Sequence, residues 1–203
     1  MKSMNKKYKL LTEDTIKVDG RILYRIESLI NFSDIGRWEN DIYTDKKKTL
    51  WKGNPTETLR SFGYVRKGEK GGYIEKESNL SHEGFCWVYE NAKVFENGVV
   101  SGDACAYGDS CVRGNAKLYD YAAIFDHSEV CDEAKVYGYA TVNDHSIVSK
   151  LAKVYGYAYI YGSSEISCKM RIGGHTHVYD DIVISAYSKT IRKVLSWIKN
   201  TNY

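Results

Sequence analysis

Residues 134–157 read AKVYGY-ATVNDH-SIVSKL-AKVYGY, so one block of six letters returns unchanged after two intervening blocks. In each block the first residue is small and the third is aliphatic. This spacing of six runs without a break from Val88 to Ile184. Neither an α-helix, with about 3.6 residues per turn, nor a strand, with a period of about two, produces a period of six. The spacing therefore indicates a repeat architecture.

Two sets of positions define the repeat, and both are expected to point into a common core. The aliphatic set is Val88, Val94, Val100, Ala106, Val112, Leu118, Ile124, Val130, Val136, Val142, Val148, Val154, Ile160, Ile166, Ile172, Val178 and Ile184, in which only Ala106 is undersized. The small set lies two positions earlier and comprises Cys86, Ala92, Gly98, Ala104, Ser110, Ala116, Ala122, Ser128, Ala134, Ala140, Ser146, Ala152, Ala158 and Ser164.

A repeat of six residues predicts a mainly all-β fold, namely a single-stranded left-handed parallel β-helix. Three six-residue sides form one coil of 18, so residues 86–185 make about 5–6 coils, and equivalent residues of successive coils stack about 4.8 Å from each other. Glycine and aspartate are expected at the corners, where the backbone needs unusual angles. The predicted corner residues are Gly102, Gly108, Gly114, Gly138, Gly156, Gly162 and Gly174, with Asp120, Asp126, Asp132, Asp144 and Asp180.

The residues before the array, 1–85, are expected to form a small β-rich cap. Asp19-Gly20 joins two strand-like stretches at 15–18 and 21–24, which is a typical two-residue hairpin signal. Residues 36–63 lose all periodicity and contain a lysine run, two tryptophans and the single proline. This segment is predicted to be a long inserted loop, and such loops are often functional.

The residues after the array, 186–203, follow a different pattern. Apolar residues recur there at helical spacing, and Ser188 is placed as an N-cap. We expect a C-terminal capping α-helix that closes the open end of the β-helix, as the terminal repeats of such folds require. The apolar residues of this predicted helix are Ile191, Val194, Leu195 and Ile198.

The composition argues against a membrane protein and against a bound metal. The net charge of +3 is too small to indicate nucleic-acid binding by itself. The first ten residues lack the apolar segment of a signal peptide, and the chain has no apolar run of membrane-spanning length. The five cysteines include no CxxC pair, which is typical of reduced thiols. We expect a cytoplasmic protein with no membrane partner, no cofactor and no metal site.

Several segments resemble known proteins: residues 68–75 (GEKGGYIE), 79–81 (NLS), 86–89 (CWVY) and 91–94 (NAKV). The array resembles the hexapeptide-repeat left-handed β-helix superfamily, which includes acyltransferases. More closely, the chain is similar to a group of bacterial and phage-encoded proteins that join a short N-terminal β cap to GNAxVYG-type repeats. The resemblance covers residues 8–35 and 64–185 and not 36–63. It implies the fold and a phage or prophage origin, and it implies no catalytic residue.

Stacking of each coil on the next sorts the outward side chains into three faces, of which the first is nearly all aromatic. A contiguous apolar face usually contacts another domain or subunit. We expect this face either to form a homo-oligomer or partner contact, or to be covered within the chain by the cap or the C-terminal helix. The second face is mixed and predicts no particular chemistry. The candidate interface residues of the first face are Trp87, Tyr89, Tyr107, Phe125, Tyr159, Tyr161 and Tyr179.

The third face repeats a cation and two tyrosines in every coil. Stacked like charges repel, so such an array costs stability unless an external group neutralises it. Cations among aromatic rings are suited to an anionic, stackable ligand such as a nucleotide, or to an acidic protein surface. The alternative is a solvated face that repeat duplication produced. The candidate binding residues are Lys117, Lys135, Lys153 and Arg171, then Tyr119, Tyr137 and Tyr155, and then Tyr121, Tyr139 and Tyr157, followed by His175.

Two histidines provide the candidate for catalysis. His127 and His145 occupy equivalent positions in successive coils and should stack at one corner, where one of them would act as the general base of an acyltransferase. Two observations oppose this interpretation. Ser128 and Ser146 occupy the inward small position, so they are not nucleophiles. The spacing of six is never interrupted by a loop that would build a cleft for an acyl donor.

The sequence therefore predicts a non-enzymatic binding or scaffold protein that uses rigid β-helix faces. The resemblance directs this expectation to a phage-encoded protein that acts on a host factor, either a defence protein or its nucleotide messenger. Two alternatives remain: an acyl-coenzyme-A-dependent hexapeptide acyltransferase, and a structural or virion assembly protein.

Overall fold

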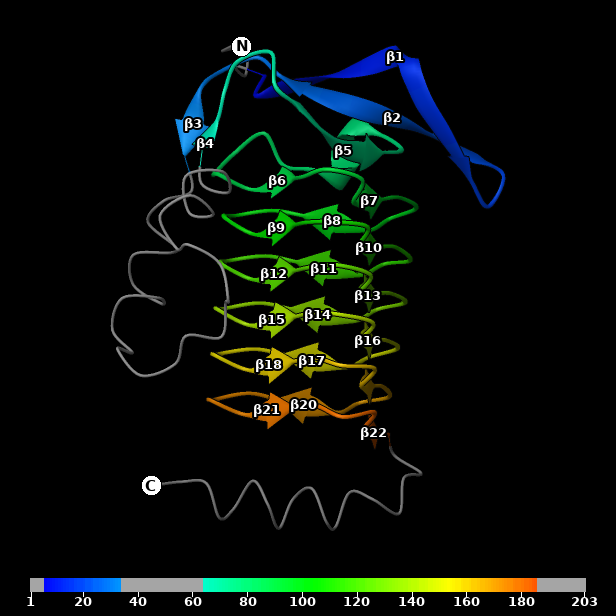
Figure 1. Cartoon of the computed structure of the whole chain (residues 1–203), viewed down its shortest axis with the longest axis vertical. Coiled ribbons are helices and arrows are strands. Elements are labelled where there is room, and N and C mark those ends of the chain that lie inside the picture. Colours follow the sequence, from blue (N-terminus) through cyan, green and yellow to red (C-terminus); the bar gives the residue numbers. More distant parts are fainter. Residues whose placement is uncertain (1–5, 34–63, 186–203) are drawn as a thin grey trace.

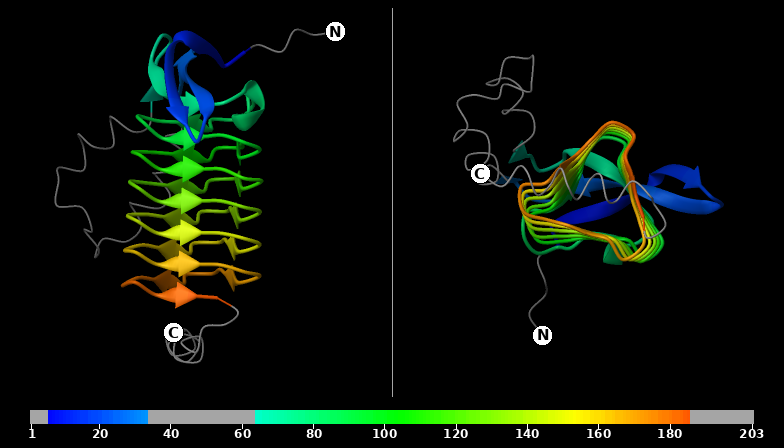
Figure 2. Two further views of the ribbon diagram at one scale, coloured as in Figure 1. Left: turned by 90° about the vertical axis from the view of Figure 1, so that its right-hand side faces the viewer. Right: turned by 90° about the horizontal axis from the view of Figure 1, so that it is seen from below.

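The computed structural model describes residues 6–33 and 64–185, which form a three-sided parallel β-helix topped by an antiparallel hairpin (Figure 1). Seen along the axis, the coils superpose as a triangle (Figure 2). About six turns are present, which confirms the predicted all-β fold. The predicted loop at 36–63 lies outside the described residues, and so does the predicted capping helix at 186–203.

Each side of the triangle is one parallel sheet of two-residue strands in which residue i pairs with residue i+18. The β7 sheet contains β7 (Lys93–Val94), β10 (Cys111–Val112), β13 (Glu129–Val130), β16 (Ile147–Val148), β19 (Glu165–Ile166) and β22 (Val183–Ile184). The β8 sheet contains β8 (Val99–Val100), β11 (Lys117–Leu118), β14 (Lys135–Val136), β17 (Lys153–Val154) and β20 (Arg171–Ile172). The β6 sheet contains β6 (Trp87–Val88), β9 (Cys105–Ala106), β12 (Ala123–Ile124), β15 (Thr141–Val142), β18 (Tyr159–Ile160) and β21 (His177–Val178).

The hand of the coil follows from the direction of three successive strands. In Figure 1 the chain descends while β6 runs to the right and β8 runs to the left. The left panel of Figure 2 shows the right-hand side of that view, and there the strands of the β7 sheet run away from the viewer of Figure 1. A chain that turns right, then backward, then left while it descends forms a left-handed coil, as predicted.

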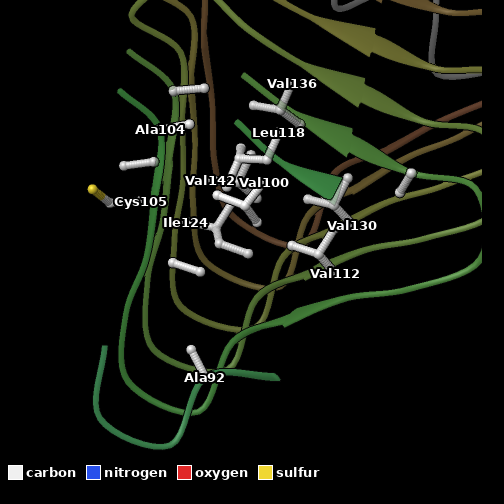
Figure 3. Packing of buried hydrophobic residues seen from close by; sticks show 14 of the residues in the cluster. Ala92, Val100, Ala104, Cys105, Val112, Leu118, Ile124, Val130, Val136 and Val142 are labelled. Carbon is white, nitrogen blue, oxygen red and sulfur yellow. The ribbon is translucent and has the colours of Figure 1, made fainter. Parts of the chain in front are cut away.

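The core is a column of inward side chains (Figure 3). Every aliphatic position of the repeat from Val88 to Ile184 is at most 5% exposed, and the small positions two residues earlier are also buried. Removing one aliphatic side chain of this size from water contributes about 1.5–3 kcal/mol. The inner positions therefore account for most of the apolar burial and leave the outer positions free to vary.

The corners use two solutions to the same backbone requirement. All the predicted glycines and aspartates adopt a positive φ, between 55° and 75°. At Asp120, Asp132 and Asp144, the carboxylate accepts a hydrogen bond from the backbone N–H of the equivalent corner in the next coil. Asp132 contacts the N–H of Lys150 at 3.0 Å, and Asp144 contacts that of Gly162 at 2.9 Å. An acidic corner thus offsets its strained φ by tying one coil to the next.

The cap is built on the predicted hairpin. Strand β1 (Tyr8–Val18) pairs antiparallel with β2 (Arg21–Ser28), and Asp19-Gly20 forms the turn with φ values of 49° and 79°. Strand β2 also pairs antiparallel with β5 (Lys70–Ile74), which pairs in parallel with β7. The hairpin therefore extends the β7 sheet beyond the first coil. A further pair joins β3 (Phe32–Ser33) to β4 (Tyr64–Val65).

The β-helix begins earlier than the unbroken period of six indicates. Ile74 pairs with Val94 and Leu80 bridges to Val100, so the partners in both pairs lie slightly further apart in the chain than those of later coils. Two extra residues between Leu80 and Val88 therefore hide the first coil from a search at fixed period. A short 3₁₀ helix, η1 (Glu77–Asn79), lies in this coil. Within the described residues, no helix is long and apolar enough to cross a bilayer.

Candidate binding surface

The β8 sheet carries a single file of basic side chains on its outer surface, which we call the cation column. The side chains are exposed or half-buried, and the parallel register places each one beside the next. Paired strands lie about 4.8 Å apart, so the column runs along the β-helix axis as predicted. The four members are Lys117, Lys135, Lys153 and Arg171.

No member of the cation column forms an ion pair within 4.0 Å with any residue of the described ranges 6–33 and 64–185. Ion pairs lie elsewhere, such as Arg21 with Glu75 at the cap and Arg113 with Glu129 on the β7 sheet. Two unit charges about 5 Å apart in water repel each other by about 0.8 kcal/mol, and salt reduces this further. The column therefore costs stability that an external anion would offset.

Of the two corners that flank this column, the one that follows the strands supplies little negative charge to it. Asp120 follows Lys117 by three residues, but its carboxylate accepts a hydrogen bond from the N–H of Gly138 at 3.2 Å. In the next three coils the same corner position is occupied by Gly138, Gly156 and Gly174, all with positive φ. In these four coils the corner therefore has one carboxylate, which is already hydrogen-bonded, and three glycines, which have no side chain.

Two columns of aromatic rings flank the glycine corner. Within each column, neighbouring ring centroids are 4.8–5.4 Å apart and the ring planes are within 13° of parallel. The rings thus stack on each other along the axis and leave their edges toward solvent. The inner column, beside the cations, consists of Tyr119, Tyr137 and Tyr155, and the outer column consists of Tyr121, Tyr139, Tyr157 and His175.

This stacking restricts how a ligand meets the aromatic rings. A base inserted between two rings needs about 6.8 Å between them, twice the roughly 3.4 Å rise of stacked bases. The observed spacings of 4.8–5.4 Å leave no room for such an insertion. A ligand could therefore stack on the faces of these rings only at the ends of the columns. Along their length, a ligand meets ring edges, hydroxyl groups and cations.

The inner column ends on a glycine that the sequence analysis did not single out. Gly173 occupies the position of Tyr155 in the next coil, and a Cβ there would lie 2.3 Å from Cε2 of the Tyr155 ring. The guanidinium of Arg171 lies 5.7 Å from the centroid of the same ring. In the sequence, this position changes from tyrosine to glycine after three coils. That change was the sign that the Tyr155 ring occupies the space beside Gly173.

The phenol groups of the inner column are suited to donate hydrogen bonds. Burial raises the pKa of Tyr119, and the charges of Tyr137 and Asp120 raise it further. An un-ionised phenol is an O–H donor. The surface therefore combines ammonium and guanidinium groups with neutral donors, an arrangement suited to carboxylates or phosphates.

The two candidate catalytic histidines lie beside each other at their corner, as predicted, but their rings are tilted and not stacked. The ring centroids of His127 and His145 are 5.0 Å apart, the rings are tilted by 32°, and both side chains are exposed. Ser128 and Ser146 are fully buried, and each donates a hydrogen bond to a backbone carbonyl at 3.3 Å. The serines are core residues, which confirms the prediction that they occupy the inward small position.

The predicted aromatic interface divides into a buried and a half-buried part. Trp87 is 0% exposed and packs edge-on against Tyr8 and Phe32, at centroid distances of 6.2 and 5.4 Å. Trp87 is therefore covered by the cap of the same chain, which was one of the two predicted alternatives for this face. Tyr89 and Tyr107 are also buried, and their rings stack at 4.4 Å. The half-buried residues of this face are Phe125, Tyr159, Tyr161 and Tyr179.

A buried amine under the cap is the main polar feature that the sequence did not predict. Lys7 is 2% exposed, and its Nζ donates to the carbonyls of Cys86 at 2.9 Å and Gly84 at 3.2 Å. Beside it, the Tyr8 hydroxyl donates to the carbonyl of Leu80 at 2.8 Å. The side chains tie β1 to the first coil. In the sequence this lysine sits among others that are typical of a solvated terminus.

In the part of the chain that the structure describes, no group of three or more histidine, cysteine, aspartate or glutamate side chains could hold a metal ion. Burial raises the pKa of Cys111 to about 12, with Glu129 adding to the shift. Burial likewise raises the pKa of Cys131 to about 12. Since the thiolate is the reactive form, both thiols are poor nucleophiles at neutral pH.

Neither protein-family models nor curated proteins match this chain. A function for it therefore has to follow from its own surfaces, and three of these are candidates. The cation column with its tyrosine columns differs from the histidine corner and the aromatic face in one respect. It alone combines repeated charge with an absence of ion pairs to the described residues.

Proposed function

We propose that this protein is a non-enzymatic binding protein that holds an acidic partner on the cation column and the two tyrosine columns. The observation that carries the proposal is the row of four cations without an ion pair to the described residues. The fold does not require this charge, because the outer positions of the other sheets are occupied by different residue types. A partner that supplies carboxylates or phosphates would relieve the repulsion and gain charge-assisted hydrogen bonds.

Rigidity supports the same proposal. Each cation sits on a strand that pairs with the coils above and below, so the row keeps its spacing without a partner. Binding to a preorganised row costs less ordering entropy than binding to flexible loops. The row also offers steering, since repeated charge of one sign raises the association rate of an oppositely charged partner.

The resemblance to phage-encoded proteins gives the proposal a setting. In that setting the partner is a host factor in the cytoplasm, either a defence protein or its nucleotide messenger. The ring spacing favours the protein, because a nucleotide base finds stacking faces only at the ends of the columns. A defence protein with an acidic surface would engage the whole length of the row.

The aromatic face adds a second contact to the proposal, a homo-oligomer formed through Tyr159 and Tyr161. Tyr161 and Tyr179 stack with centroids 5.4 Å apart, and aromatic residues are enriched in interface cores. Light scattering of the purified chain tests this contact. A discrete oligomer that dissociates in the Tyr161→Ala variant is expected. Long, open-ended assembly would instead favour the structural or virion alternative.

Titration with labelled poly-glutamate tests the binding surface. We expect saturable binding at low salt, and a loss of at least about tenfold in affinity in the Lys135→Glu/Lys153→Glu variant. The matched control is Lys17→Glu/Lys67→Glu, which makes the same charge change on exposed residues of the cap segment. Equal loss in both variants would show non-specific attraction and overturn the proposal.

Two small ligands complete the titration. ATP serves as the probe for a nucleotide partner, and acetyl-coenzyme A as the probe for the acyltransferase alternative. Binding of acetyl-coenzyme A by calorimetry that is lost in His127→Ala or His145→Ala would replace the proposal by the enzyme. Absence of binding to poly-glutamate and to ATP alike would also end it.

A further inference from the structure

The row of cations has a definite spacing, and that spacing selects the shape of an acidic partner. We infer that the partner presents an α-helix with carboxylates along one face, and that this helix lies parallel to the β-helix axis over the cation column. The inference rests on the proposed function and adds the secondary structure and orientation of what binds. It is argued from the spacing of the cations, the stacking of the rings and the accessibility of the side chains.

The spacing of the cation column matches that of a helix better than that of a strand. Four cations on successive coils span three steps of about 4.8 Å, or about 14 Å. Carboxylates spaced one helical turn apart span about 16 Å over three turns of about 5.4 Å. Side chains on one face of a strand recur about every 6.7 Å and span about 20 Å. The helix therefore differs from the row by about 2 Å and the strand by about 6 Å.

The cations are able to absorb the smaller difference. Lysine has a flexible four-carbon stem with three ammonium donors, so small offsets at Lys117 and Lys153 are tolerated. Arg171 at the last coil is held differently, with its guanidinium 5.7 Å from the centroid of the Tyr155 ring. A planar guanidinium favours bidentate contact with a single carboxylate. Arg171 is thus suited to fix one end of the bound helix.

The aromatic columns argue against a nucleic-acid strand on the same surface. Proteins that hold single strands stack successive bases on open aromatic faces. Here the faces within both columns are covered by the next ring, at 5.0 Å between Tyr119 and Tyr137 and 4.8 Å between Tyr157 and His175. What the columns offer along their length is a ridge of ring edges and hydroxyl groups. Such a ridge is suited to packing beside a rod and to donating hydrogen bonds to its polar face.

The test compares two peptides of the same composition and about 18 residues, stapled so that circular dichroism shows equal helicity. One carries glutamates at i, i+4, i+7 and i+11, on a single face, and the other carries the same glutamates distributed around the helix. An unstapled extended acidic peptide and an oligo-dT strand are the further probes. Fluorescence anisotropy of each labelled probe gives its affinity for the full chain.

We expect the single-face peptide to bind about tenfold more tightly than its isomer, and Lys135→Glu/Lys153→Glu to abolish this difference. Lys17→Glu/Lys67→Glu should preserve it, and unchanged melting temperatures of both variants would show that they fold. Equal binding of the two peptides, or tighter binding of the extended peptide or of oligo-dT, would overturn the inference and leave the proposed surface standing if the column variant still weakens it. Failure of every probe to bind would overturn both.

Discussion

The outer surfaces of the β7 and β8 sheets are made by the same repeat, yet they handle charge in opposite ways. On the β7 sheet the outward residue changes from coil to coil, and cations there have acidic neighbours. Arg113 lies 2.5 Å from Glu129, and Lys93 lies 3.9 Å from Asp109. On the β8 sheet a cation recurs in four successive coils, without an ion pair to the described residues. The outward residues of the β7 sheet are Lys93, Cys111, Glu129, Ile147, Glu165 and Val183.

The difference shows which part of the surface the fold determines. Both sheets bury the same kind of inner residue, and both pair through the same register of one coil. The β7 sheet demonstrates that this backbone accepts cations, anions, thiols and aliphatic residues on its outside. The repeated cation of the β8 sheet is therefore not required for folding. This is why we propose that the repeated cation serves to bind a partner.

The largest expected effect comes from the inner positions, which are common to both sheets. Leu118→Ala removes a fully buried side chain, and we expect a loss of about 2–5 kcal/mol in the free energy of unfolding. Its outward neighbour Lys117→Ala should change that free energy by no more than about 0.5 kcal/mol. Denaturant unfolding measures both. A cost of Lys117→Ala comparable with that of Leu118→Ala would mean that the outer row also supports the fold.

The next effect separates acidic corners from glycine corners. Asp132 has a φ of 57° and accepts a hydrogen bond from the N–H of Lys150, so Asp132→Ala keeps the strain and loses the bond. We expect a loss of about 1–3 kcal/mol. Asp132→Gly relieves the strain and should cost less, as the glycines beside the cation column indicate. If Asp132→Gly costs more than Asp132→Ala, the positive φ does not strain a non-glycine residue at this corner.

A smaller effect concerns the junction of the cap with the β7 sheet, where an acid is paired. Burial acts to raise the pKa of Glu75, but the hydrogen bond from the N–H of Glu96 at 2.6 Å and the contact with Arg21 outweigh it. The pKa of Glu75 is therefore lowered from its usual 4.5. A lowered pKa in the folded state stabilises the junction above pH 4.5, and this contribution is lost as the pH falls through the folded-state pKa.

We expect the hydrogen-exchange protection factors of the amides in β1 and β2, which are corrected for the intrinsic exchange rate at each pH, to fall on acidification below about pH 4.5, ahead of those of the coils. In Arg21→Met, the Glu75 carboxyl has lost its cation, so the fall in protection should begin at a higher pH than in the wild type. Identical pH profiles for the two proteins would show that Arg21 does not hold the pKa of Glu75 down. The β8 sheet serves as the internal reference for exchange.

The smallest expected effect is a change in the free energy of unfolding that has opposite signs for the two sheets when a cation is replaced by methionine. Lys135→Met removes repulsion from two neighbours and should raise the free energy of unfolding by up to about 1 kcal/mol at low salt. Arg113→Met breaks an ion pair with Glu129 and should lower it by about 0.2–1 kcal/mol. Both differences should shrink in high salt. A destabilising Lys135→Met at low salt would contradict the view that the cation column is strained by its own charge.

The sequence predicted the β-helix because one period dominates it, and the structure confirms the strands, the inward residues, the corners and the hairpin turn at Asp19-Gly20. It missed the first coil, because the two extra residues between Leu80 and Val88 break the period although pairing continues. A period records regular coils, and an irregular coil with the same pairing is invisible to it.

The candidate site was predictable in outline and not in detail. The stacking of Lys117 on Lys135, and of Lys135 on Lys153, follows from the period of 18 residues and needs no coordinates. The burial of Trp87 and Lys7 depends on how the cap packs on the first coil, and residues so far apart in the chain carry no periodic signal of that contact. The ring spacing within the tyrosine columns depends on side-chain rotamers, which the sequence does not give. Only the structure shows that each ring covers the face of the next, so that a ligand cannot stack between them.

Direct pairing of residue i with residue i+18 makes the molecule a ruler. Insertion or deletion of one complete coil lengthens or shortens every face by one rung and leaves the order of the faces unchanged. Insertion of one or two six-residue sides between two of the cations would instead move the later cations to another face and divide the cation column between two sides. Tandem duplication of a short DNA segment is therefore a direct way for this chain to adjust the length of its proposed binding surface, one charge at a time.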